Sequence, residues 1–145
     1  MGVGWSLAVA AVFVWLGMVL AISFLEAPLK FRAPGVTLAV GLGIGRLVFR
    51  ALNCVEAVLA TVVVAGAVVG GVPVLGVAAA VTAAGALAVQ VLAVRPALSR
   101  RSNTVLAGGP ALQAGSRSQA HYAYVMLEMI KVIALAAAGL LLLAG

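Results

Sequence analysis

Apolar and polar positions divide the chain into four long apolar stretches. They cover about residues 4–25, 48–70, 73–94 and 122–143, and each has the roughly 20 mostly apolar residues that an α-helix needs to cross a bilayer. The short apolar-polar alternation of barrel strands is missing from them. The pattern therefore predicts an all-α, four-transmembrane-helix bundle, with residues 1–145 forming one integral membrane domain.

The start of the second span is left open by the pattern. Apolar residues begin near Val36, and one helix from there to Gly70 would be about 52 Å long, against a hydrocarbon core of about 30 Å. Either this helix projects beyond the bilayer, or residues 36–47 form a separate interfacial or re-entrant piece. The glycines of GLGIG (41–45) suit a bend or close packing.

The composition requires a lipid environment. Hydrophobic residues make up 66% of the chain and charged residues only 8%, whereas soluble domains are roughly half apolar and a quarter charged. A soluble fold could not bury this much apolar surface. The bilayer is therefore an expected partner.

The basic residues predict the orientation in the cell membrane. They gather at two expected connections, about 26–47 and 95–121, as Lys30, Arg32, Arg46 and Arg50, and as Arg95, Arg100, Arg101 and Arg117. By the positive-inside rule both connections are cytoplasmic, and the N and C termini lie on the non-cytoplasmic side. The net charge of +6 is then an orientation signal, and nucleic acid is not an expected partner.

Two polar stripes interrupt the apolar pattern of the second and fourth spans. Their members recur at helical spacing and are Arg46, Arg50, Asn53 and Glu56, and His121, Tyr124, Glu128 and Lys131. Ionisable groups inside a membrane cost about 2.5–3.5 kcal/mol each, so they normally face a partner or a wet cavity. We expect Glu56 to reach Lys131, and Glu128 to reach Arg50 or Asn53. The stripes form either a polar clasp that fixes helix register or a ligand, ion or proton site.

The polar residues do not favour a metal centre or a known catalytic motif. Glu56, Glu128 and His121 offer metal ligands, but di-iron bundles use Glu-x-x-His pairs, and this histidine lies seven residues from Glu128. GLGIGR lacks the GK[ST] ending of a phosphate loop. We expect no metal, and the pattern assigns no cofactor.

One resemblance covers nearly the whole chain. WLGMVLAISFLEAPLKFR, GLGIGRLVFRAL, VRPALSRR and SRSQAHYAYVMLE resemble the transmembrane-protein-205-like domain of unknown function. The matching positions are Pro28, Phe31, Gly45, Phe49, Pro96 and His121. This resemblance implies four spans and no established reaction.

A second, local resemblance concerns the second span. RALNCVEAVLATVVVAG is similar to a span of the membrane-associated eicosanoid and glutathione metabolism family. The resemblance implies glutathione binding at Arg50, Asn53 and Glu56, between subunits of a trimer. Arg50 stands one residue closer to Asn53 than in that family, which turns it about 100° around the helix.

Two classes of function follow from the sequence. The first is a small transporter, ligand binder or accessory membrane subunit with a polar site between spans two and four, acting in a homo-oligomer or larger membrane complex. The alternative is a glutathione-transferase-like membrane enzyme. The substrate and the oligomeric state stay open, as does whether the chain is an enzyme.

Overall fold

A computed structural model describes residues 2–108 and 119–144, and these residues form helices without any strand. The elements in chain order are α1 (Val3–Val19), the π-helical η1 (Leu20–Glu26), α2 (Ala27–Leu29), the 3₁₀-helical η2 (Lys30–Arg32), α3 (Leu38–Val69), α4 (Val74–Val89), the π-helical η3 (Gln90–Val94), α5 (Arg95–Leu106) and α6 (Gln119–Ala144).

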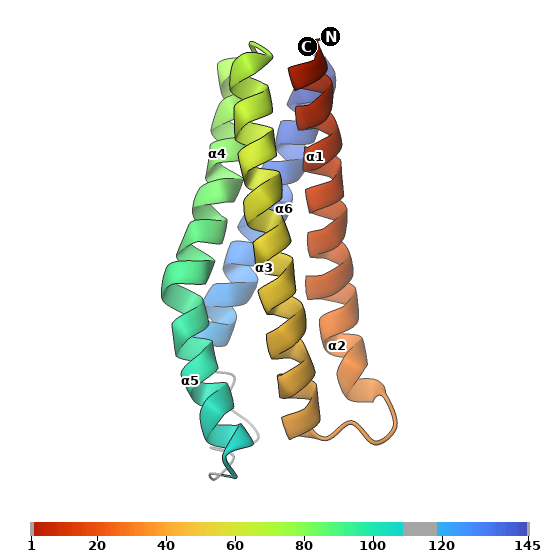
Figure 1. The fold of residues 1–145 in the computed structure, drawn as a ribbon, viewed down its shortest axis with the longest axis vertical. Helices are drawn as coiled ribbons and strands as arrows, with labels where there is room; N and C mark the ends of the chain where they lie inside the picture. Colours follow the sequence, from red (N-terminus) through yellow and green to blue (C-terminus); the bar gives the residue numbers. More distant parts are fainter. Residues whose placement is uncertain (1, 109–118, 145) are drawn as a thin grey trace.

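These elements make four long helical segments that pack side by side (Figure 1). All four are long and apolar enough to cross a membrane, and they span Val3–Arg32, Leu38–Val69, Val74–Thr104 and His121–Ala144. The two termini and the α3–α4 turn lie at one end of the bundle, and α2 and α5 lie at the other (Figure 1). The predicted four-helix bundle is confirmed.

The second span is a single continuous helix, which settles the question left open by its length. Helix α3 begins at Leu38, not near residue 48, and Thr37 caps it by accepting a hydrogen bond from the Val40 amide at 3.3 Å. Its 32 residues give a length of about 48 Å. Two of the glycines near its start serve close packing, because a Cβ at Gly41 would collide with the Phe31 ring and one at Gly45 with the Lys30 ammonium.

Two other boundaries differ from the expectation. The first segment stays helical to Arg32, and α5 extends the third to Leu106, so the described residues of the expected connections 26–47 and 95–121 are largely helical. Basic side chains can extend along a helix end and keep their charged groups near water, so a charge does not have to mark the end of a helix. Arg117 lies outside the described residues.

A π-helical turn followed by a proline occurs in both the first and the third segment. The segments η1 and η3 end at Glu26 and Val94, and Pro28 and Pro96 follow two residues later. Proline cannot donate to the carbonyl four residues back and clashes with it, and a wider turn relieves that conflict. Such π-turns are frequent at functional sites.

The core is a layer of small and branched side chains around one tryptophan. Trp15, Val63, Leu135 and Ala138 are fully buried at its centre. The outer face stays apolar, with Leu92 exposed by 77% and Leu140 by 68%. Apolar side chains on the outside of such a bundle are what a lipid environment covers.

Candidate functional site

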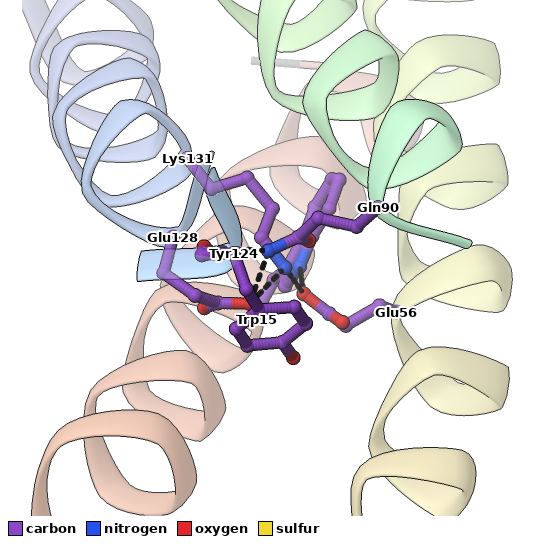
Figure 2. A network of polar contacts seen from close by, with 6 residues as sticks. All are labelled: Trp15, Glu56, Gln90, Tyr124, Glu128 and Lys131. Atoms are coloured by element: carbon purple, nitrogen blue, oxygen red, sulfur yellow. Dashed lines mark hydrogen bonds and ion pairs between the residues drawn. The ribbon is translucent and has the colours of Figure 1, made fainter. Parts of the chain in front are cut away.

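Three charged side chains meet in the interior of the bundle, between α3 and α6. Lys131 on α6 forms an ion pair with Glu56 of α3, and its ammonium lies 3.0 Å from Oε1 of Glu128 on its own helix. All three residues are 0–1% exposed. Figure 2 shows Lys131 reaching across to Glu56. We call Glu56, Glu128 and Lys131 the charge cluster.

Two neutral side chains from the other segments complete the charge cluster. The indole N–H of Trp15, on α1, donates to Glu56 Oε1 at 2.8 Å. The amide of Gln90, at the start of η3, donates to Glu128 Oε1 at 2.7 Å. All four long helical segments therefore contribute a polar side chain at one level (Figure 2).

A fourth charge joins through Asn53. With its amide oriented to match its neighbours, Asn53 donates to Glu56 Oε2 at 3.0 Å and accepts from Arg95 Nη1 at 3.2 Å. The guanidinium of Arg95 is thus linked to Glu56 only through the neutral amide of Asn53, and the direct ion pairs of both carboxylates are with Lys131. Removing one member of a buried ion pair typically costs about 3–5 kcal/mol because the other charge is left uncompensated.

A cavity of about 600 Å³ adjoins the charge cluster at the α2/α5 end of the bundle. Such a volume lies within the range of roughly 300–1,000 Å³ usual for small-molecule sites. Segments η1 to η2, α3, α5 and α6 all contribute to its wall. The polar residues of the wall are Ser23, Lys30, Arg46, Arg95, Ser99, Ser102, His121, Tyr124 and Glu128; much of the rest is aromatic or aliphatic, including Phe24, Phe31, Leu42, Phe49, Leu98 and Val125.

Three of the wall residues carry buried oxygen atoms that lack a hydrogen-bond partner within the described part of the chain. These atoms are Ser23 Oγ, the Tyr124 hydroxyl and Glu128 Oε2; the last two lie near each other without forming a hydrogen bond of standard geometry. Buried polar groups are nearly always hydrogen-bonded, so each unsatisfied one calls for a reason. A molecule bound in the cavity could form the hydrogen bonds that these oxygen atoms lack.

Seven of the eight residues of the predicted stripes fall in the charge cluster, next to it or in the cavity wall. Arg46, His121, Tyr124 and Glu128 line the cavity, whereas Asn53, Glu56 and Lys131 lie buried beside it. The expected pair of Glu56 with Lys131 is present. Glu128, however, bonds Lys131 and Gln90 instead of Arg50 or Asn53.

Arg50 is the predicted site residue that falls outside this arrangement. It is exposed and does not belong to the cavity wall, while Asn53 and Glu56 point into the bundle and are paired. The three residues of the glutathione-type pattern are thus not brought together.

Three participants were missed by the sequence reasoning: Trp15, Gln90 and Arg95. Gln90 offered a signal, because it is the only amide in the apolar stretch 73–94. Arg95 is interpreted from the sequence as an orientation charge and as a partial match to the tyrosine and arginine cluster of the glutathione-type family, not as a partner of Asn53. Trp15 gave no signal beyond the hydrogen-bonding need of a buried indole.

Within residues 2–108 and 119–144, no three His, Cys, Asp or Glu side chains lie close enough together to hold a metal ion. Glu56, Glu128 and His121 therefore do not form a ligand set. Glu56 and Glu128 are instead bonded to Lys131.

No family model, curated protein or solved structure matches the chain. The cavity and the charge cluster are therefore the features that bear on the function of this chain.

Proposed function

We propose that this chain is an integral membrane protein that binds a small molecule in the cavity at the α2/α5 end. One observation carries the proposal: a cavity of ligand size has three wall residues with unsatisfied buried oxygen atoms, those of Ser23, Tyr124 and Glu128. A ligand would supply the missing partners. The ligand-binding role is the one inferred from the sequence. The proposed site, however, is the cavity at the α2/α5 end and not the polar stripes between spans two and four alone.

Binding is favoured over transport because the bundle is closed beyond the cavity. Trp15, Glu56 and Lys131 are fully buried on the side of the cavity that faces the termini. A transported molecule would have to break this cluster to pass. We therefore propose the charge cluster as a rigid floor for the bound molecule, not as a gate.

We also propose that the α2/α5 end faces the cytoplasm and that the chain is similar to the transmembrane-protein-205-like domain. The positive-inside rule supports a cytoplasmic α2/α5 end, because the basic residues outside the charge cluster that the structure describes lie near that end. A four-span helical bundle is also what the resemblance to the transmembrane-protein-205-like domain implies. Glutathione binding is less favoured because Arg50 lies apart from Asn53 and Glu56.

A pocket-filling variant tests the proposed function. Ser102 lines the cavity, and its neighbour Asn103 is exposed and does not. In Ser102→Trp the indole would occupy the cavity, whereas in Asn103→Trp it would project from the bundle. Both proteins would be purified in mild detergent and analysed by native mass spectrometry for bound small molecules, glutathione included as an added probe.

We expect the wild type and Asn103→Trp to retain a bound molecule that Ser102→Trp loses, with all three melting within a few degrees of one another. The same spectra show whether further copies or a larger membrane partner accompany the chain. Loss of the bound molecule from both variants alike, or its retention by Ser102→Trp, would contradict a site in this cavity.

A further inference from the structure

The wall of the cavity carries more positive charge than this chain can neutralise. Lys30, Arg46 and Arg95 line it, with Glu128 as the one carboxylate. The chain has only three acidic residues. Each is already bonded to a lysine: Glu26 to Lys30 at 3.4 Å, and the two acidic members of the charge cluster to Lys131.

No carboxylate is therefore left for the two arginines of the wall. Arg95 bonds a neutral amide, that of Asn53. Arg46 is exposed, on the first third of α3. An anion is the missing counter-charge, and a guanidinium is well suited to bind a carboxylate or phosphate through two parallel hydrogen bonds.

Lys30 is a fixed part of this wall. Its side chain is only 9% exposed, and its ammonium lies 5.7 Å and 5.3 Å from the ring centroids of Phe31 and Phe49, within the range of cation–π attraction. Gly45 makes room for it, because a Cβ there would lie 2.8 Å from Nζ. The ammonium is thus held in place before any ligand arrives.

The remaining wall selects for more than charge. Phe24, Leu42, Leu98 and Val125 give it an apolar surface that a small inorganic anion would leave uncovered. A wholly apolar molecule would leave Arg46 and Arg95 without a carboxylate or other anion as counter-charge, and Lys30 with Glu26 alone. Only a molecule that has both a negative charge and an apolar part can pair with the cations and also cover the apolar surface of the wall.

We propose that the cavity binds an amphiphile with one compact anionic headgroup, a carboxylate or a phosphate, and an apolar body. The headgroup lies among Lys30, Arg46 and Arg95, and the body lies against the aromatic and aliphatic wall. This inference rests on the proposed function. The amphiphile comes either from the bilayer, as an anionic lipid, or from the aqueous phase, and the two share this headgroup chemistry.

Binding would be measured with the full chain in nanodiscs of phosphatidylcholine alone. The probes are dodecyl phosphate, dodecanoate, dodecanol, dodecyltrimethylammonium and inorganic phosphate. We expect the two anionic amphiphiles to bind at least about tenfold more tightly than the other three, since one factor of ten is about 1.4 kcal/mol and a charge-assisted hydrogen bond contributes more than that.

Arg46→Gln should weaken dodecyl phosphate binding about tenfold. The matched control is Arg50→Gln, one turn further along α3, exposed and outside the wall, and it should leave the affinity unchanged. Phosphatidylglycerol added to the nanodisc should compete with dodecyl phosphate if the natural ligand is a bilayer lipid, and should not if it is a soluble amphiphile.

The outcomes separate this inference from the proposed function. Equal affinity for the charged and neutral dodecyl probes, still lost in Ser102→Trp, would overturn the anionic headgroup and keep the binding site. Equal weakening by Arg46→Gln and Arg50→Gln would show general surface attraction and overturn the headgroup site. Absence of binding by every probe, together with no co-purified molecule, would overturn both.

Discussion

At the scale of single residues, Lys131 is the centre of the buried polar contacts. Its ammonium bonds Glu56 from the neighbouring helix and Glu128 from its own. Removing the lysine leaves the two buried carboxylates of Glu56 and Glu128 close together without a cation. Removing the Glu56 carboxylate leaves Lys131 still paired with Glu128. The two changes should therefore differ in their cost.

A double-mutant cycle tests this asymmetry. We expect Lys131→Met to lower the free energy of unfolding by about 3–5 kcal/mol, the usual cost of an uncompensated buried charge. Glu56→Gln should cost about 1–2 kcal/mol, because its amide oxygen still accepts hydrogen bonds. Unfolding in mixed micelles, followed by tryptophan fluorescence, gives both values.

The double variant decides whether the pair is coupled. Glu56→Gln with Lys131→Met should be more stable than Lys131→Met alone, with a coupling free energy of roughly 0.5–3 kcal/mol. Simple addition of the two losses would count against the Glu56–Lys131 pair.

The sequence predicted the buried residues of spans two and four better than their partners. Helical spacing placed Asn53, Glu56 and Glu128 on inward faces, and they are buried. The partner Arg95 follows the π-helical η3, which shifts the faces that an ideal helix would present. Face arguments assume 3.6 residues per turn, so they fail beyond such a turn.

At the scale of the elements, close contact of α1 and α3 depends on glycine. A Cβ at Gly66 of α3 would lie 2.7 Å from the carbonyl oxygen of Gly4 and 3.2 Å from the Cβ of Ala8. Small residues let helix backbones approach in this way. Gly43, on the same helix, has nothing within 4 Å of the corresponding position.

The two glycines make a matched pair for substitution. Gly66→Ala should lower the free energy of unfolding by about 1–3 kcal/mol, since overpacking forces the backbones apart. Gly43→Ala should leave it unchanged or raise it by up to about 1 kcal/mol, because alanine favours the helix. Both are measured by unfolding in mixed micelles, and equal effects would contradict the packing role of Gly66.

The number and type of the elements could be predicted, but not all of their ends. Apolar length alone gives four spans. The start of α3 at Leu38 could not be decided, because Val36 to Arg46 is apolar enough for either a helix or an interfacial piece. Contacts between distant segments, such as Phe31 over Gly41, settle that choice, and the pattern does not contain them.

At the scale of the whole molecule, charge and cavity lie at the same end of the bundle. The described basic residues other than Lys131 belong to the α2/α5 half, as does the cavity wall. The α3–α4 turn and the chain ends carry no charged side chain. The side of the membrane on which this end lies would therefore determine which compartment supplies the proposed ligand.

Cysteine labelling tests the proposed orientation. In a Cys54→Ser background, which removes the one native cysteine, Ala33→Cys reports on the connection before α3 and Val74→Cys on the α3–α4 turn; both positions are exposed. A membrane-impermeant maleimide should label Val74→Cys in right-side-out vesicles, and Ala33→Cys only in inside-out vesicles, because translocating the basic connections is disfavoured. The reverse pattern would place the cavity on the outer side.

The labelling pattern also indicates where the proposed anionic amphiphile comes from. With the expected pattern its source is the cytoplasm or the inner leaflet, where anionic headgroups are held near basic side chains. With the reverse pattern it would have to come from the outer leaflet or the external medium.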